Sequence, residues 1–258
     1  RTFPAEELCG VIFVFVGDED FDVPPLLHDL PNKVDENENL RTPCLQDEDA
    51  LALGIHRDCL GDWRLAAESG GDPGHIMIHR KSALVFALDT ALSLGEPVTG
   101  ADSLRIWDKE WPKGITKFFD NIVPVMHRED LNIHTYGKRP PDGLRVSLVL
   151  PSILFVENWP LPGMTQYEWY VPTTQGRHAY WQILVKNCPT ELDKEDFTLR
   201  YESVWEDLAL KAGFNDDDIF AREAMDDFYT NRNGWDEEQL FSMDQFVVEF
   251  RKLVHKHA

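Results

Sequence analysis

Basic side chains are scarce in this chain of 258 residues, in which 25 Lys and Arg stand against 46 Asp and Glu and the formal net charge is −21. Nucleic acids and anionic membranes bind proteins through clustered Lys and Arg, so the balance argues against both as general partners. Long apolar runs are also lacking, since the longest, Val11–Val16, is far too short to cross a bilayer. These absences predict a soluble, cytoplasmic protein.

Cysteine spacing excludes two further kinds of site. The four cysteines form neither a Cys-x-x-Cys nor a Cys-x-His pattern, so the sequence shows neither a zinc knuckle nor an iron–sulfur cluster. Reduced, mostly buried thiols are expected at Cys9, Cys44, Cys59 and Cys188. The chain opens at Arg1 with neither a start methionine nor a signal-peptide pattern, which indicates a fragment of a longer protein.

The sequence has enough apolar material for one sizeable core, with 43% hydrophobic residues, eight Trp and fifteen Phe. The apolar stretch 8–17 is typical of a buried strand, and the acidic, Pro-rich stretch 18–49 of a surface connection between domains. Aromatic and β-branched runs predict a large antiparallel sheet, with strands at 103–108, 121–127, 144–150, 152–158, 165–171 and 177–186. Helices are predicted at 62–68, 193–211, 215–229 and 243–256. The fold class is therefore α+β.

Two histidines form the main candidate site. Asp72 is expected to cap a helix on which His75 and His79 stand one turn apart and face the same way. Such a pair can chelate one metal ion, although surface or core histidines often show the same spacing. A zinc protease would need Glu directly after the first histidine, where this chain has Ile76, so peptide hydrolysis is disfavoured.

A third ligand is expected near the start of a later helix. Asn215 is a good N-cap, and Asp216, Asp217 and Asp218 would fill the first turn. Carboxylates there stabilise the helix dipole by about 0.3–1 kcal/mol each, which explains them without a metal. Two histidines and one carboxylate are nevertheless the facial triad of non-haem Fe(II) oxygenases. From the residues alone, any of the three aspartates can be the ligand.

Four separated motifs in this sequence resemble those of a known enzyme family. Together they resemble the terminal oxygenases of the carbazole 1,9a-dioxygenase type, a family of homotrimeric Rieske ring hydroxylases. The likeness runs from Phe3 to the C-terminus and is strongest at residues 62–65, at the Asp72, His75 and His79 pattern, at 166–172 and at 215–225. It implies the helix-grip fold of a Rieske oxygenase catalytic domain.

By this resemblance His75, His79 and Asp218 bind a mononuclear Fe(II), and Asp218 is chosen because it directly precedes the matching Ile-Phe-Ala-Arg-Glu-Ala run. The resemblance gives Asp72 a catalytic role. It hydrogen-bonds a ligating histidine and passes an electron from the neighbouring subunit's Rieske cluster. A plain helix-capping role is the alternative.

The resemblance also implies a substrate pocket for a flat, apolar, polycyclic molecule. The main-chain carbonyl of Gly70 would accept the substrate N–H. Ordinary core packing is the alternative for the apolar members of the lining, which is Gly70, Ile76, Val146, Leu154, Val156, Trp159, Gln166, Phe214 and Asn215. Two positions depart from the family, since Gly71 and Trp159 stand where Phe is usual, and both are expected to alter the pocket.

The cluster ligands of a Rieske domain, two Cys and two His in Cys-x-His and Cys-x-x-His pairs, are absent. We expect residues 1–30 to be the C-terminal remnant of that domain and a connection, and residues 31–258 to be the iron domain. The [2Fe–2S] cluster would then lie upstream, and this chain alone would be inactive. NAD(P)H would supply electrons through a reductase and a ferredoxin to the Rieske cluster. The intact oxygenase would be a homotrimer.

The implied reaction inserts O₂ into a polycyclic (hetero)aromatic such as carbazole, in aromatic hydrocarbon catabolism. Both oxygen atoms would enter adjacent ring carbons, one of them bonded to the nitrogen. The alternatives are a Rieske monooxygenase or other ring hydroxylase, a helix-grip module that binds a hydrophobic ligand without catalysis, and a metal-dependent hydrolase.

Overall fold

The computed structural model describes residues 2–17, 22–23, 25–26, 30, 42–72, 75, 78–79, 82–84, 122–126, 132–137, 145–240 and 244–257. Within these residues, seven antiparallel strands form one sheet in the order β3-β9-β8-β7-β6-β5-β4. The strands are β3 (Ala50–Leu60), β4 (Ile122–Met126), β5 (Asn132–Gly137), β6 (Arg145–Val149), β7 (Ile153–Glu157), β8 (Met164–Thr174) and β9 (Arg177–Asn187). The predicted large antiparallel sheet and the α+β class are confirmed.

Five of the predicted strands coincide with β4, β6, β7, β8 and β9, while 103–108 lies outside the described residues. Two strands were not anticipated. β3 carries His56, Arg57 and Asp58 in succession. It lies at one edge of the described sheet, where β9 is its neighbour, so much of it faces solvent and can be polar. The other, β5, consists mainly of polar residues and glycine.

The prediction of one buried strand over 8–17 is wrong. The segment belongs to a separate hairpin of β1 (Ala5–Leu8) and β2 (Val11–Val14), which turns at Cys9 and Gly10, both with positive φ. Alternate β2 residues face solvent, and Ile12 is 71% exposed. Phe13 points inward, with its ring centroid 5.9 Å from that of Trp169. A tight turn inside an apolar run therefore divided it in two.

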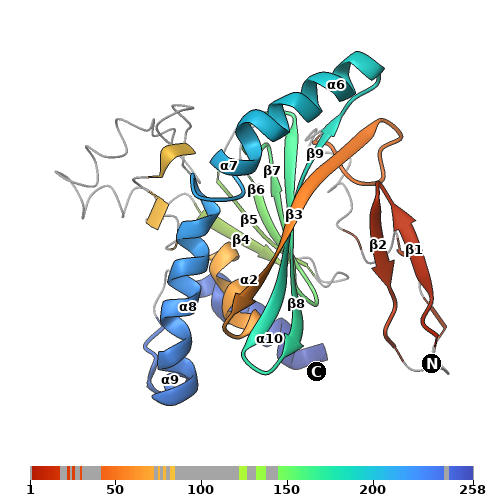
Figure 1. Cartoon of the computed structure of the whole chain (residues 1–258). Coiled ribbons are helices and arrows are strands. Elements are labelled where there is room, and N and C mark those ends of the chain that lie inside the picture. Colours follow the sequence, from red (N-terminus) through yellow and green to blue (C-terminus); the bar gives the residue numbers. More distant parts are fainter. Residues whose placement is uncertain are drawn as a thin grey trace.

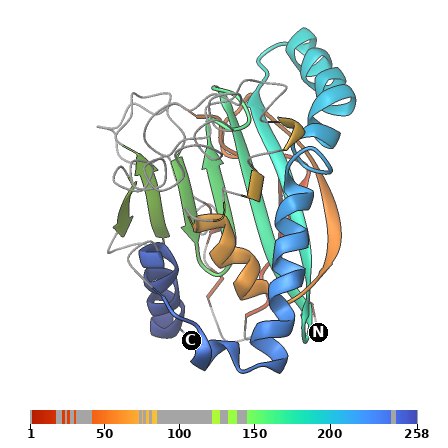
Figure 2. The same ribbon diagram turned by 90° about the vertical axis from the view of Figure 1, so that its left-hand side faces the viewer.

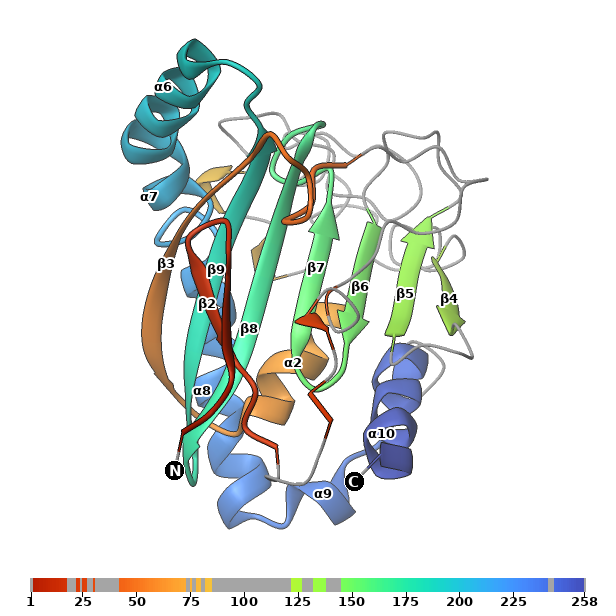
Figure 3. The same ribbon diagram turned by 90° about the vertical axis from the view of Figure 1, so that its right-hand side faces the viewer.

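Helices and the hairpin cover opposite faces of the sheet (Figures 1 and 3). On one face lie α2 (Trp63–Gly71), α8 (Asn215–Asn231) and α10 (Gln245–His257), and α6 (Glu191–Arg200) leads through a π-helical turn (Tyr201–Trp205) into α7 (Glu206–Leu208). The short α9 (Gly234–Glu237) joins α8 to α10. The larger apolar core fills the helix face, and a smaller one lies under the hairpin.

The predicted helices 193–211 and 243–256 are confirmed with modest shifts, since the first ends at Leu208. The helix predicted at 62–68 is three residues longer at its end, since it continues through Ser69, Gly70 and Gly71. Arg251 of α10 holds α2 in place through two 2.7 Å hydrogen bonds to the buried carboxylate of Glu68. This charge pair fixes the helix from which the candidate site begins.

The predicted surface connection 18–49 is partly buried where it is described. Residues 42–45 are buried, and the Thr42 hydroxyl donates to Glu157 at 2.7 Å. All four cysteines are free thiols, and three of them are buried, as expected. No helix in the described part of the chain combines the length and apolarity that a membrane span requires.

Candidate metal centre and cavity

Asp72 is the C-cap of α2, and residues 73–74 and 76–77, on which the predicted histidine helix depends, lie outside the described residues. The main-chain N–H of Asp72 donates to the carbonyls of Glu68 and Ser69. The main-chain N–H of His75 then donates to the Asp72 carbonyl at 3.2 Å, and His75 and residues 78–79 adopt 3₁₀ turns.

The two histidines still come together. Their ring centroids lie 5.6 Å apart at an interplanar angle of 89°. The His75 Nδ1 atom makes a short hydrogen bond to the main-chain oxygen of Asp72, while the His79 ring stacks on Phe214 with centroids 3.7 Å apart. Each ring is thus held by a contact that does not involve a metal.

The first turn of α8 directs its three aspartates in different directions. Asp216 forms an ion pair with Arg57 of β3, and the Asp217 side chain is 44% exposed. Only Asp218 is buried, with its side chain 5% exposed. The expected N-cap is displaced by one residue, since Phe214 occupies the cap position and Asn215 begins the helix. Successive helical residues point about 100° apart, which is why one aspartate of the three can face the histidines.

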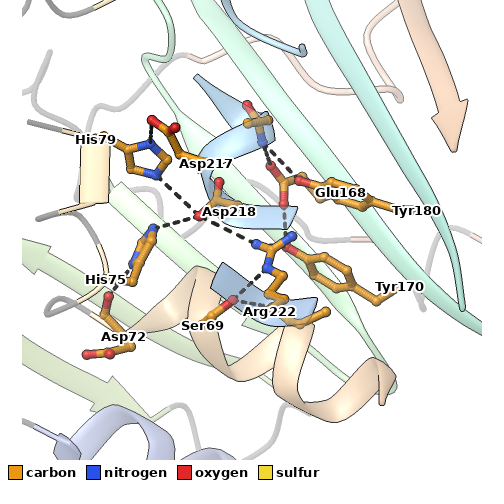
Figure 4. Close-up of polar contacts among 12 residues, drawn as sticks. Ser69, Asp72, His75, His79, Glu168, Tyr170, Tyr180, Asp217, Asp218 and Arg222 are labelled. Carbon is orange, nitrogen blue, oxygen red and sulfur yellow. Dashed lines mark hydrogen bonds and ion pairs between the residues drawn. The ribbon is translucent and has the colours of Figure 1, made fainter. Parts of the chain in front are cut away.

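His75, His79 and Asp218 converge on one point (Figure 4). Asp218 Oδ1 lies 3.2 Å from His79 Nε2 and 3.8 Å from His75 Nε2, and all three ligand atoms lie within 4.8 Å of one another. Two ligands at about 2.1 Å from one ion and at right angles lie about 3.0 Å apart. The separation between His79 and Asp218 is close to this value and the others are wider, so the donor set fits a divalent metal once the ligands close in slightly. Two nitrogens with one carboxylate match the facial triad that suits Fe(II).

Burial and charge act against each other in this cluster. Burial opposes a charge on His79, but Asp218 and Asp217 outweigh it and raise its pKa to about 9. Burial alone would raise the pKa of Asp218, yet His79 and Arg222 hold it well below its usual value. Burial lowers the pKa of His75. A cation is thus favoured between the rings and the carboxylate.

Arg222 was missed by sequence reasoning. It lies one helical turn after Asp218, is 3% exposed, and its Nη2 atom is 3.9 Å from Asp218 Oδ1. Its Nε donates to the Ser69 hydroxyl at 2.7 Å, and its Nη2 donates to the Tyr170 hydroxyl at 3.3 Å. The i,i+4 spacing from Asp218 was the available signal.

A cavity of about 50 Å³ adjoins His75 and Asp218, and we call it the inner cavity. Eight of the nine predicted lining residues border it, and Ile76 lies outside the described residues. The eight are Gly70, Val146, Leu154, Val156, Trp159, Gln166, Phe214 and Asn215. Glu168 and Arg222 complete the lining and were not anticipated, although Glu168 faces the same side of β8 as Gln166.

A second cavity, of about 290 Å³, borders Asp72, His75, Asp218 and Arg222, and we call it the outer cavity. His75, Asp218 and Arg222 thus line both cavities. Figure 4 shows the Asp72 carboxylate turned away from His75, so the contact between these two residues is made by the main chain.

The two departures from the family pattern have clear packing consequences. A Cβ atom at Gly71 would lie 1.6 Å from the ring of Phe246, so this ring already occupies the space of a side chain at position 71. The Trp159 ring lies over Phe214, with centroids 4.8 Å apart, and narrows the inner cavity.

The helices α2 and α8 carry much of this site. They lie side by side across the sheet (Figure 2).

Comparison with known proteins agrees with this architecture. The family model described as homotrimeric ring hydroxylase matches residues 15–258. The chain is 39% identical over 263 residues to the terminal oxygenase component of carbazole 1,9a-dioxygenase from Sphingomonas sp, and 37% identical over 266 residues to that from Metapseudomonas resinovorans. All of this chain is covered, and it spans 66% and 65% of the length of these relatives.

Solved structures give the same result. A component of 2-oxoquinoline 8-monooxygenase, with a Rieske [2Fe–2S] centre, superposes with a TM-score of 0.78 at 35% identity, over 98% of this chain and 62% of that one. The terminal oxygenase of carbazole 1,9a-dioxygenase from Nocardioides aromaticivorans gives 0.75 at 29% identity, over 99% and 68%. The chain belongs to the homotrimeric ring hydroxylase family.

Proposed function

We propose that this chain is the catalytic part of an aromatic-ring-hydroxylating terminal oxygenase. The observation that carries the proposal is the convergence of His75, His79 and Asp218 beside an inner cavity with largely apolar walls. A bound Fe(II) would supply the activation of O₂. The protein would hold this ion with two imidazoles that are already positioned by Asp72 and Phe214.

The inner cavity would orient the substrate. Val146, Leu154 and Val156 from β6 and β7 form one wall, and the rings of Trp159 and Phe214 form another, so a flat aromatic molecule can be held by apolar contact. The Gly70 carbonyl would accept a substrate N–H. A Cβ at position 70 would lie 2.6 Å from a methyl carbon of Leu154, so Leu154 would have to shift to admit a side chain there.

Asp72 would serve electron transfer rather than metal binding. It borders the outer cavity but not the inner cavity, and its main-chain oxygen contacts the ring of His75. A neighbouring subunit's cluster domain could approach on this side without blocking the substrate. In this proposal Asp72 links that cluster to the His75 ring.

The whole enzyme would contain more than this chain. We propose that residues 1–30 end a Rieske domain carrying the [2Fe–2S] cluster, that 31–258 form the iron domain, and that three copies assemble. Solved relatives include complexes of carbazole 1,9a-dioxygenase oxygenase with ferredoxin, which supports a ferredoxin as the electron donor here. NAD(P)H would act only through a reductase and that ferredoxin.

The reaction can insert either two oxygen atoms or one. Relatives that act on carbazole favour insertion of both oxygen atoms, while the likeness to 2-oxoquinoline 8-monooxygenase favours a single hydroxylation. Carbazole-type dioxygenation is the first proposal because both curated relatives are named for it.

The test uses the chain loaded anaerobically with iron, then given carbazole or 2-oxoquinoline and ¹⁸O-labelled hydrogen peroxide. Peroxide brings both oxygen atoms and both oxidising equivalents, so neither reductase nor cluster is needed. An oxygenase yields a labelled diol or phenol. A hydrolase yields no oxidised ring, and a binding module retains no stoichiometric iron, so either result would contradict the proposal.

A further inference from the structure

Glu168 is the polar centre of the inner cavity wall. Its carboxylate is buried and accepts hydrogen bonds from three side chains, those of Gln166, Tyr170 and Asn215. The Tyr170 hydroxyl in turn accepts from Arg222, whose guanidinium lies over the Tyr170 ring (Figure 4). Each of these bonds runs from an NH₂ or O–H donor to a carboxylate oxygen of Glu168. Both neighbouring amides therefore turn their NH₂ groups towards Glu168.

This arrangement leaves two amide oxygens without partners. Gln166 Oε1 and Asn215 Oδ1 are buried and accept no hydrogen bond from any described residue, and both residues line the inner cavity. Asn215 Nδ2 donates to Glu168 at 3.0 Å and to the Tyr180 hydroxyl at 2.9 Å, and turning this amide round would place its oxygen against the Glu168 carboxylate and break that bond. Unpaired buried acceptors are costly, and a ligand that donates a hydrogen bond recovers that cost.

The only other side-chain oxygens among the described lining residues are those of the Glu168 carboxylate, which already accepts three hydrogen bonds, and of the Asp218 carboxylate, which belongs to the ligand cluster. Five of the lining residues have apolar side chains with no hydrogen-bonding group of use to a ligand N–H. Arg222 Nη1 is also unpaired within the described residues, but it is a donor, and its guanidinium borders the outer cavity as well. Side-chain recognition at the inner cavity is thus biased towards ligands that donate.

We propose that Glu168 is a positioning residue that makes the inner cavity selective for aromatic substrates with a ring N–H. It does so by fixing Gln166 and Asn215 with their oxygens free to accept. The inference rests on the proposed function, because it takes the cavity to hold an aromatic substrate. It adds a side-chain acceptor pair to the main-chain oxygen of Gly70.

The test measures dissociation constants of the iron-free chain by fluorescence titration. Carbazole carries the N–H, whereas fluorene and N-methylcarbazole have similar shapes and lack it. We expect carbazole to bind the unmodified chain several-fold to about tenfold more tightly, the range of one net hydrogen bond. In Glu168→Gln the new amide can donate to its neighbours and occupy their oxygens, so the preference should fall towards one.

Two further variants separate positioning from folding. Gln166→Met removes one acceptor while leaving Glu168 in place, and it should also reduce the preference. Glu157→Gln makes the same chemical change at a buried carboxylate bonded to Thr42, outside the inner cavity lining, and should leave the preference unchanged. Thermal unfolding of each variant confirms that the chain is folded.

The outcomes are distinct. If carbazole keeps its full advantage in both Glu168→Gln and Gln166→Met, Gly70 alone reads the N–H and the inference is overturned. If the unmodified chain binds all three aromatics equally, the inference fails while the proposed function stands. If it binds none of them, the proposed aromatic site itself fails and the inference falls with it.

Discussion

The Nε2 atom of His79 lies 3.2 Å from Oδ1 of Asp218, although 139 positions separate the two residues in the chain. Main-chain bonding helps to fix this relationship, since Leu84 donates to the carbonyl of Gly213 at 3.1 Å. That bond ties the segment after His79 to the turn before α8. The ligand cluster is therefore built by the fold, and a metal ion would bind to a site that is largely formed in advance.

The three neighbouring aspartates provide a direct test of the ligand assignment. Asp218→Ala removes a ligand and should lower Fe(II) affinity by more than the roughly 10- to 100-fold that loss of an outer partner costs. Asp216→Ala breaks only an ion pair with Arg57, and Asp217→Ala removes a half-exposed group 3.7 Å from His79 Nδ1. Both should retain iron, as measured by metal content after anaerobic loading and dialysis. Iron loss in Asp217→Ala alone would shift the assignment by one residue.

Sequence patterns predicted the sheet because β6 to β9 are rich in aromatic and β-branched residues, which strands favour wherever they lie. They did not predict β3, since an edge strand needs no apolar face along its whole length. The extension of α2 through Gly70 and Gly71 has a similar cause, because the low helix propensity of glycine was overridden by the packing of α2 against Phe246 and Leu154. Local signals are reliable only where tertiary contacts agree with them.

In the candidate site, too, some features follow from local sequence and others depend on tertiary contacts. The spacing of His75 and His79 predicted a metal-binding pair from the sequence alone. The choice of the third ligand among three adjacent aspartates depended on the direction in which each side chain leaves α8. Glu168 and Arg222 read as ordinary polar residues until the fold buries them together. Their roles are set by partners 47 and 52 positions away, Asn215 and Tyr170 respectively, which spacing rules do not reach.

Asp72→Asn tests the proposed electron route. The contact with His75 comes from the main-chain oxygen, which asparagine keeps, so we expect unchanged iron content. Turnover in a protein that also carries the cluster domain should be abolished. Peroxide-driven oxidation, which needs no electron from the cluster, should remain near the level of the unmodified protein. Normal turnover with ferredoxin would remove the proposed role, and equal loss of both activities would show that the change damages the iron site instead.

Trp159→Phe tests what limits substrate size. The Trp159 ring is 5% exposed and lies over Phe214 beside an inner cavity of only about 50 Å³. A smaller ring frees apolar space, so three-ring carbazole should gain affinity relative to two-ring indole by roughly three- to tenfold. Both ligands carry an N–H, so the ratio reports size alone. Phe155→Leu, under the hairpin on the other face, should not move it. An unchanged ratio in Trp159→Phe would mean that another wall sets the limit.

Gly71→Ala tests whether Phe246 has taken the space of a side chain at position 71. The added Cβ would lie 1.6 Å from the Phe246 ring, so we expect a loss of about 1–3 kcal/mol in unfolding free energy from overpacking. Urea unfolding with a comparison of midpoints measures it. In a Phe246→Ala background the ring is gone, and the same change should become neutral or stabilising, because alanine favours a helix over glycine by about 1 kcal/mol. Equal losses in both backgrounds would show that the glycine is required for some other reason than this ring.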